Sequence, residues 1–309
     1  MAVCESGSVS AGAERSHVSQ SAMSAALAGL ERALGTDLLQ RHRRGVTLTP
    51  GGAELLARIR SILAEVDDLH TIASDIGGAL SGPLRVGCYS TLAPALMPKT
   101  IEGFVRHNPD VALSFFEGSD MELLSALSRG ECELVITYDY AEAHFAEPNA
   151  MNRIPLTGAP PKALVPTEHP LAEGPVSLAD LAIEPLILLD LYPSAEYFLK
   201  LFVDRGHEPI VRFRSKSNQL VMNLVAEGLG CAVLTQLGSG GDVVAGGGAT
   251  VKAFSDDLPA LPIVAFHPAG VRLTRRARTF LDSCRVALGA TSEPDVSSAA
   301  EKPARAPAD

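Results

Sequence analysis

Several signatures of common protein classes are missing from this 309-residue chain. No run approaches the about 18 to 20 consecutive apolar residues that a membrane-spanning helix needs. The N-terminus has no basic segment followed by an apolar one, so no secretory signal is visible and no membrane partner is expected. The five cysteines lack CxxC spacing, which favours a reducing cytoplasm over a disulfide framework. They are Cys4, Cys88, Cys132, Cys231 and Cys284.

Motifs for catalysis and metal binding are missing as well. The eight histidines include no HExxH or CxxC…HxxxH spacing for a metal ion. No GxSxG motif marks a nucleophilic serine. Residues 237–250 are rich in glycine, but no GK[ST] follows them, so a flexible loop is favoured over a phosphate-binding loop. We therefore expect neither an enzyme nor a bound cofactor.

Positive charge is scarce overall but concentrated near the N-terminus. The net charge of −10 argues by itself against a nucleic-acid partner. Between Arg15 and Arg60, however, seven arginines face three acidic residues, a local charge of +4. A basic first segment on an acidic chain is typical of a DNA-binding head on a larger body.

Residues 19–34 carry the pattern of an amphipathic helix. Its apolar side chains recur at the spacing of a buried stripe, at Met23, Leu27, Leu30 and Leu34. The opposite face is almost entirely small, with Ser21, Ser24, Ala25, Ala28 and Arg32. Such a low face lets the helix backbone come close to a DNA groove.

The flanks of this helix complete a winged helix-turn-helix. Residues 9–15 can form a shorter preceding helix, joined by a turn at residues 16–18, and Gly35 ends the long helix. Residues 41–48 then predict a basic hairpin, the wing. The head looks short at its start, because residues 2–4 provide at most one turn of a first helix. Two positions look unfavourable: Gly12 lies inside the short helix at a cost of about 1 kcal/mol, and Ser16 replaces an expected apolar residue.

A second long helix should begin at Pro50, capped by Thr49. Its apolar residues alternate in steps of four and three over about three heptads. The members of this seam are Leu55, Ile59, Ile62, Val66, Leu69, Ala73 and Ile76, and Gly77-Gly78 ends it. We expect self-association through the seam, as a homodimer or homotetramer; packing on the chain's own domain is the alternative.

The rest of the chain alternates short apolar strands with helices, an α/β arrangement with largely parallel sheets. The predicted strands are 84–88, 111–116, 134–137, 162–165, 186–189, 210–214, 231–235 and 261–266. The predicted helices are 92–105, 121–129, 194–205, 217–227 and 274–288. Residues 290–309 are rich in alanine, proline and serine, which predicts a disordered tail.

With these elements placed, the chain resembles a LysR-type transcriptional regulator. In the head the match is carried by Glu5-Ser6-Gly7-Ser8, Ala13-Glu14-Arg15, His17-Val18-Ser19-Gln20-Ser21-Ala22-Met23-Ser24, Leu30-Glu31, Leu34-Gly35, Leu38-Leu39, Arg41 and Leu48-Thr49-Pro50-Gly51-Gly52. Further on it is carried by Gly82-Pro83-Leu84-Arg85-Val86-Gly87, His169-Pro170-Leu171-Ala172 and Leu224-Val225-Ala226-Glu227-Gly228-Leu229-Gly230. Family members have about one helix more before the first of these motifs.

The resemblance implies a domain layout. Residues 1–49 would be the winged helix-turn-helix and residues 50–78 the linker and dimerisation helix. Residues 83–289 would be an effector domain with the bilobed fold of type 2 periplasmic binding proteins. Lobe 1 is expected at about 83–158 and 267–289, and lobe 2 at about 159–266.

The resemblance also implies double-stranded DNA as a partner. The helix from Ser19 would enter the major groove, with Gln20, Ser21 and Ser24 at base edges or phosphates; glutamine can pair bidentately with adenine. Phosphates or the minor groove would be held by Arg32, Arg41, His42, Arg43 and Arg44. On the residues alone, Gln20 and the serines are as expected for capping and surface positions.

A cleft between the lobes would hold a small-molecule effector. Ser90 and Thr91 follow the first strand and are the first candidates for contact, and Thr137 and Tyr138 at a later strand end are next. Further polar residues lie at predicted helix starts, namely Ser119, Ser194, Ser217 and Asn218. Converging helix N-termini favour an anion, so a small carboxylate is the expected effector. Capping alone equally explains Ser119 and Ser217, and a structural role for Cys88 is favoured over redox sensing.

These observations predict a DNA-binding transcriptional regulator controlled by an effector. The short first helix supports a second hypothesis, a ligand-binding sensor that has lost DNA binding through N-terminal truncation. The intact helix stripe and basic wing oppose it.

Overall fold

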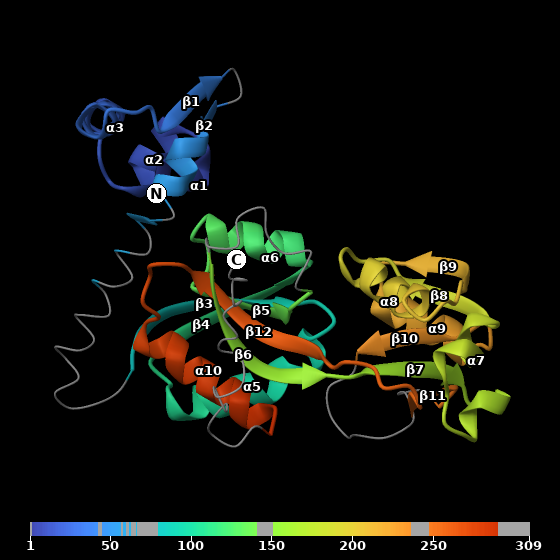
Figure 1. The fold of residues 1–309 in the computed structure, drawn as a ribbon. Coiled ribbons are helices and arrows are strands. Elements are labelled where there is room, and N and C mark those ends of the chain that lie inside the picture. The colour runs from blue at the N-terminus through green and yellow to red at the C-terminus, as the bar shows by residue number, and fades with distance from the viewer. Residues whose placement is uncertain are drawn as a thin grey trace, which may run out of the picture.

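The computed structural model describes residues 2–42, 45–56, 58, 59, 62, 66, 80–140, 151–235 and 247–289. Figure 1 shows an N-terminal head beside the first of two α/β lobes. In this described part of the chain, no helix has the length and apolar character needed to cross a membrane. The predicted tail, residues 290–309, lies outside it.

The head is a winged helix-turn-helix, as predicted. Its helices are α1 (Ala2–Ser6), α2 (Val9–Arg15) and α3 (Gln20–Leu34), and its wing pairs β1 (Leu39–His42) with β2 (Gly45–Leu48). Gly35 ends α3 in the left-handed conformation at φ 67°, which a glycine adopts without steric cost. A hydrogen bond from the Val46 backbone N–H to the Gly7 carbonyl, 2.9 Å long, ties the wing to the α1–α2 turn.

Gly12 has a structural purpose that the sequence pattern did not reveal. A Cβ atom on this residue would lie 2.7 Å from Cα and 2.8 Å from the backbone nitrogen of Val3. Glycine is therefore what allows α1 to pack directly on α2, and Val3 is buried there. Ser16 is the exposed C-cap residue of α2, where a polar side chain is well suited. Neither position is a defect of the head.

The predicted buried stripe of α3 is only partly buried. Met23 and Leu27 are half-buried, whereas Leu30 and Leu34 are exposed by 40% and 44%. The five-residue α1 packs on α2. Among the described residues of the head, the buried apolar side chains are Val3, Val9, Ala13 and Leu38, next to Leu56 of the linker helix. Two leucines of α3 therefore remain uncovered within one chain.

The linker helix begins as predicted. Thr49 caps it, since its Oγ1 accepts a hydrogen bond of 2.9 Å from the Gly52 backbone N–H. Of the predicted seam, Leu55 and Ile59 are half-buried, while Ile62 and Val66 are exposed by 51% and 42%. Leu69, Ala73 and Ile76 lie outside the described residues. Arg58 donates to the carbonyl of Gly270 at 3.3 Å, a contact between this helix and the effector domain.

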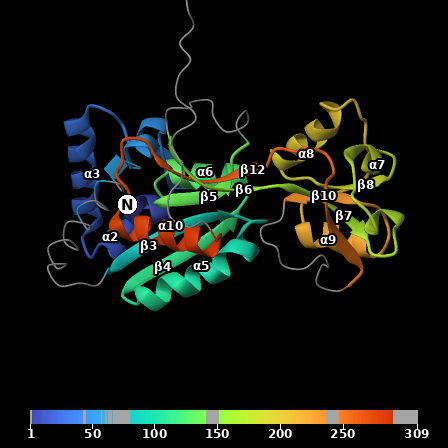
Figure 2. The same ribbon diagram turned by 60° about the horizontal axis from the view of Figure 1, so that its bottom comes forward.

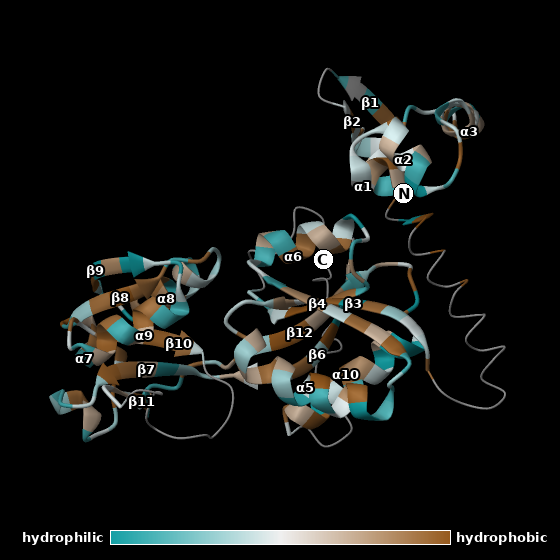
Figure 3. Cartoon of the chain, turned by 180° about the vertical axis from the view of Figure 1, so that it is seen from behind, coloured by the Kyte–Doolittle hydropathy of each residue, from teal (hydrophilic) through white to brown (hydrophobic). Residues whose placement is uncertain are grey.

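Lobe 1 contains a five-stranded sheet in the order β4-β3-β5-β12-β6. Its strands are β3 (Gly82–Tyr89), β4 (Val111–Gly118), β5 (Leu134–Tyr138), β6 (Met151–Ala159) and β12 (Leu261–Pro268). In Figure 1, α5 (Ala93–His107) and α10 (Arg275–Ala287) lie together on one side of the sheet and α6 (Asp120–Ser128) on the other. Figure 3 shows apolar strands at the centre of both lobes.

Lobe 2 contains two small sheets. One has the order β10-β7-β11, with β10 (Ala232–Thr235) and β11 (Ala249–Ala253) antiparallel to β7 (Pro161–Pro166). The other pairs β8 (Pro185–Leu189) with β9 (Ile210–Ser215). The helices are α7 (Leu178–Ala182), α8 (Ser194–Val203), α9 (Asn218–Ala226) and the short η1 (Pro170–Ala172). Figures 1 and 2 both show β6 and β12 leading from lobe 1 toward lobe 2.

The structure corrects two predictions about the effector domain. The sheets are mixed rather than largely parallel: β3 is parallel to β4 and β5, but β12 is antiparallel to β5 and β6. The predicted lobe 2 boundary at residue 266 is also wrong, because β12 pairs within the sheet of lobe 1. The strands β6 and β11 were not predicted.

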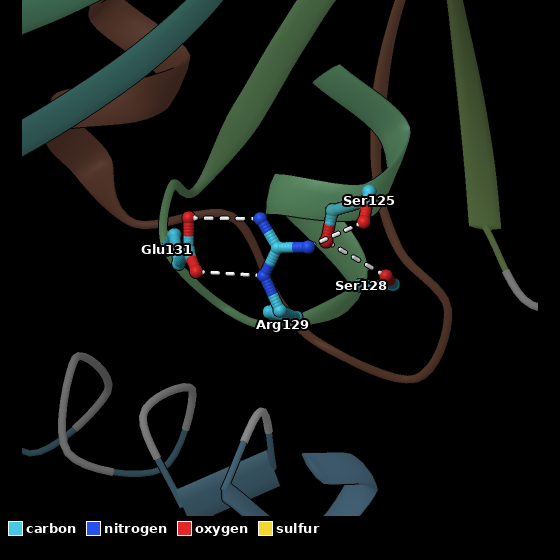
Figure 4. A network of polar contacts seen from close by, with 4 residues as sticks. All are labelled: Ser125, Ser128, Arg129 and Glu131. Carbon is cyan, nitrogen blue, oxygen red and sulfur yellow. Dashed lines mark hydrogen bonds and ion pairs between the residues drawn. The ribbon is translucent and has the colours of Figure 1, made fainter. Parts of the chain in front are cut away.

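The corner between α6 and β5 is held by a polar network, shown in Figure 4. Arg129 forms a two-point ion pair with Glu131, through Nε at 2.7 Å and Nη2 at 3.2 Å, and also donates to Ser125. The hydroxyl of Ser128 donates to the Ser125 carbonyl at 2.9 Å. These contacts hold the turn that leads from α6 to β5, and both elements contribute side chains to the site between the lobes.

Candidate functional site

Helix α3 presents the predicted DNA-contacting residues on its surface. Gln20, Ser21 and Arg32 are exposed, and Ser24 is half-buried. Ser19 caps the helix instead of projecting freely: its Oγ accepts from the Ala22 backbone N–H at 3.2 Å. The structure thus gives α3 a polar outer face with a capped, accessible N-terminus.

The wing extends this surface. Strands β1 and β2 meet in the register His42↔Gly45, and His42 is exposed. Arg43 and Arg44 lie outside the described residues, as does the side chain of Arg41.

Between the lobes lies a group of buried and half-buried aromatic, hydroxyl and carboxyl side chains, here called the interlobe cluster. It consists of Tyr89, Thr91, Asp120, Thr137, Tyr138, Tyr140, Ser194, Tyr197 and Thr235. The rings form a chain of edge-on contacts, with centroids 5.7 Å apart for Tyr89–Tyr138, 6.1 Å for Tyr138–Tyr140 and 5.7 Å for Tyr140–Tyr197. Because Tyr197 belongs to α8, this chain of rings crosses from lobe 1 to lobe 2.

Tyr138 lies beside hydroxyl groups from both lobes. The hydroxyls of Thr235 on β10 and of Thr91 after β3 lie close enough to its phenol to affect its pKa. Burial raises the pKa of Tyr138, and these two contacts partly oppose that rise. The structure therefore places Thr91 and Tyr138, both named from the sequence as candidate effector contacts, beside each other; that they contact an effector stays a prediction.

Tyr89 brings an unusual polar atom to the cluster. Its side chain is fully buried, and within the described part of the chain its hydroxyl has no hydrogen-bond partner of good geometry. The hydroxyls of Tyr140 and Ser194 lie close to it. A buried hydroxyl without a partner costs free energy unless something satisfies it.

The N-terminus of α8 lies at the interlobe cluster, close to Tyr89. Ser194 opens this ten-residue helix and is buried, and no side chain caps the helix, since its N-cap residue is Pro193. Backbone N–H groups of a first helical turn have no partner within the helix. Here the N–H of Ala195 donates to the Leu191 carbonyl at 2.9 Å, so only part of the first turn is available to a ligand. A buried, uncapped helix start beside an unpartnered phenol is suited to an anionic group.

The cluster also includes a buried acid, Asp120. The hydroxyl of Thr137 donates to Oδ1 of Asp120 at 2.8 Å, and both residues are buried. Asp120 is the first residue of α6, and its charge adds to burial in raising the pKa of Tyr89 and Tyr140.

The other predicted contact residues lie at caps and turns. Ser119 forms a complete capping box with Glu122, and a hydrogen bond from Ser119 lowers the pKa of that carboxyl. Ser217 caps α9 through the Leu220 backbone N–H at 3.3 Å. Asn218 donates to the Met222 sulfur at 3.5 Å. The backbone N–H of Ser90 donates to the Gly118 carbonyl at 3.1 Å. Within the described residues, these contacts do not connect Ser119, Ser217 or Asn218 to the rings.

The four buried cysteines are poorly placed for thiolate chemistry. Burial is the main cause that raises the pKa of Cys88, and it raises the pKa of three further thiols to about 12; these are Cys132, Cys231 and Cys284. Reactive cysteines instead have lowered pKa values. Cys88 is buried, as expected of a structural cysteine.

These parts define a DNA-binding regulator with an effector domain. The parts are the winged helix-turn-helix head, the linker helix and the two lobes with a polar interlobe cluster. Residues 77–289 match the LysR substrate binding domain, and residues 1–53 match the bacterial regulatory helix-turn-helix protein, lysR family. The chain belongs to the LysR family of transcriptional regulators.

Similar proteins support this assignment. The hydrogen peroxide-inducible genes activator of Dickeya chrysanthemi is 30% identical over 275 residues, 88% of each chain. The DNA-binding transcriptional dual regulator OxyR of Escherichia coli K12 is 32% identical over 227 residues, 73% of each chain. Among solved structures, HinK of Pseudomonas aeruginosa has a TM-score of 0.62 at 29% identity, covering 93% of this chain and 95% of HinK.

A full-length OxyR variant from Pseudomonas aeruginosa has a TM-score of 0.70 at 26% identity, covering 92% of this chain and 94% of that one. Members of the family bind DNA and small-molecule effectors and act as oligomers. The relatives are transcriptional regulators and not enzymes. Because the helix-turn-helix match covers the whole head, the hypothesis of a sensor without DNA binding is not favoured.

Proposed function

We propose that this regulator binds a small carboxylate in the interlobe cluster and that the bound ligand changes how the paired heads engage DNA. The observation that supports this most is the buried, uncapped start of α8 at Ser194, next to the unpartnered hydroxyl of Tyr89. Backbone N–H groups and a phenol are the donors that a carboxylate accepts from. Since the rings link β3 and β5 to α8, a ligand among them would bias the angle between the lobes.

The proposal is tested by thermal unfolding of the full-length protein with a library of small carboxylates. A true effector raises the melting temperature, because it binds the folded state, and also changes the affinity or the footprint on operator DNA. Ligands that stabilise the protein but leave DNA binding unchanged would contradict the proposal that the bound ligand changes how the heads engage DNA. A library without any stabilising acid would contradict the ligand class.

For DNA, we propose that the outer face of α3 reads bases while Arg32 and the wing hold phosphates. We expect Gln20→Ala to relax sequence preference with a small loss of overall affinity, because glutamine would contact a base edge. Arg43→Ala should weaken binding to all sequences and reduce the salt dependence by about one counterion. Fluorescence anisotropy with operator and scrambled duplexes at four salt concentrations distinguishes a loss of sequence preference from a uniform loss of affinity. A Gln20→Ala protein with unchanged sequence preference would refute the assignment.

We propose further that the homodimer forms along the linker seam. The exposed Ile62 and Val66, together with Leu30 and Leu34 on α3, leave apolar side chains uncovered in a single chain. A second copy would remove them from water.

Peroxide sensing by thiols, suggested by the names of several relatives, does not fit these side chains. Millimolar hydrogen peroxide should leave DNA binding unchanged, because a thiol with a pKa of about 12 is ionised in only about one molecule in 100,000 at pH 7. Mass spectrometry should find Cys132, Cys231 and Cys284 still reduced, with the E. coli OxyR treated in parallel as the responsive control. A peroxide response that Cys231→Ser abolishes and reductant reverses would overturn this prediction.

A further inference from the structure

The head and the first turns of the linker helix form one unit. Thr49, the cap of the helix, donates from its hydroxyl to the Asp37 carbonyl at 2.7 Å and from its backbone N–H to the Leu38 carbonyl at 3.0 Å. At Gly52 a Cβ atom would lie only 2.1 Å from the Leu38 carbonyl oxygen, so the helix backbone lies directly against the head. Leu56, one turn further along, is also buried. The start of the linker helix therefore turns together with the head.

Arg58 lies two residues beyond Leu56 and contacts lobe 1. Its Nη1 donates to the Gly270 carbonyl at 3.3 Å. A Cβ atom on Gly270 would lie 3.6 Å from Nη1 and 3.8 Å from Nη2, so both terminal nitrogens of the guanidinium lie beside this residue. Gly270 has a φ of 70° and belongs to the turn between β12 and α10. Arg58 thus joins the head unit to a backbone atom of the effector domain.

The turn that accepts this hydrogen bond is itself held within lobe 1. Thr274, at the end of the turn, donates to Oε2 of Glu133 at 2.7 Å, directly before β5. Arg276 is only 1% exposed, and its Nη1 donates to the Ser81 carbonyl at 3.1 Å, directly before β3. The turn is therefore tied to the starts of two inner strands of the sheet. A contact between Arg58 and this turn defines the direction of the linker helix relative to lobe 1.

We infer that Arg58 is a positioning residue for DNA binding, which acts through Gly270 to set the direction in which lobe 1 presents the head. Members of the family act as oligomers, so more than one head meets the same DNA molecule. Two heads bind two half-sites at full strength only when their separation and rotation match those of the half-sites. Without the Arg58 contact the linker helix takes more than one direction, and the discrimination between half-site spacings falls. This inference depends on DNA binding and not on any effector.

The test measures the affinity of the full-length protein for duplexes built on its own upstream DNA, whose half-sites are first located by footprinting. One duplex keeps the native spacing, others have one or two base pairs more or fewer, and one contains a single half-site. Each added base pair turns the second half-site by about 34° around the duplex axis. For Arg58→Gln we expect the preference for the native spacing to fall by about 3-fold or more. The fold should be unaffected, because Arg58 is exposed.

Arg272→Gln is the matched control, because Arg272 is an exposed arginine two residues from Gly270 and its replacement removes the same charge. It should keep the spacing preference of the native protein and change the affinity for the single half-site by a similar factor to Arg58→Gln. The inference is overturned if Arg58→Gln keeps the native preference, if Arg272→Gln loses it equally, or if the native protein does not distinguish the spacings. A uniform loss of affinity at every spacing, with a lower melting temperature, would show a structural role and also overturn it.

Discussion

Replacing Gly12 with valine should reduce the affinity for DNA by roughly 100-fold, equivalent to about 3 kcal/mol. A Cβ at this position would lie 2.6 Å from Cγ2 and 2.7 Å from Cα of Val3, so the clash involves backbone as well as side chain. Helix α1 would have to separate from α2, which exposes Val3. Because few apolar side chains are buried in the head, it has little stability to lose.

The measurement is operator binding together with thermal unfolding of the same samples. Gly29→Ala is the matched control, because Gly29 lies within α3 and a Cβ there meets no atom within 4 Å. It should stabilise the helix by about 1 kcal/mol and leave DNA binding intact. Native-like DNA binding by Gly12→Val would show that α1 is dispensable to the head.

Replacing Tyr89 with phenylalanine should weaken effector binding by about 10- to 100-fold without lowering stability. The Tyr89 hydroxyl is buried and lacks a good partner among the described residues. Its removal therefore relieves a desolvation cost in the free protein, and the melting temperature should stay equal or rise. In the complex, the same change removes a hydrogen bond to a charged group, worth about 1.5 to 3 kcal/mol.

Tyr192→Phe serves as the control, since Tyr192 is 57% exposed and does not belong to the cluster. Calorimetry with the strongest binder from the carboxylate library gives the affinities, and differential scanning gives the stabilities. If Tyr89→Phe lowers stability and leaves affinity unchanged, the hydroxyl is structural and the proposed position of the effector is wrong.

Local signals made much of the head predictable. Gly35 as a helix end and Thr49 as a cap act through neighbouring backbone atoms, so the sequence alone identifies them. The role of Gly12 was missed because the reason for it, the backbone of Val3, lies on another helix. The exposure of Leu30 and Leu34 was missed because periodicity shows which side chains share a face, but not how much covers that face.

In the effector domain, edge strands were the hardest elements to predict. The sequence of β6 contains Pro155 and polar residues instead of an apolar run, and its pairing with β12 shifts register between Ile263 and Val264, next to that proline. Edge positions tolerate both features. The short β11, also at an edge, follows the glycine-rich segment that obscured it.

The candidate site was predictable where polar residues follow strands or open helices. This rule selected Thr91, Thr137, Tyr138 and Ser194, which the structure brings into one cluster. Tyr89, Asp120 and Tyr140 were missed, since their partners come from distant segments. The neighbouring polar side chains at residues 89–91 and 137–140 offered a signal for the two tyrosines, and the capping-box pattern at residues 119–122 offered one for Asp120.

The central claim, a DNA-binding regulator governed by an interlobe ligand, is tested most directly by a salt-graded titration of the protein with its own upstream DNA. The titration is run with and without the strongest-binding acid. We predict a steep fall of affinity with salt, a preference of about 1,000-fold or more over scrambled duplex, and a ligand-dependent change in affinity or footprint. Equal affinity for operator and scrambled DNA at every salt concentration, unaffected by ligand, would contradict it.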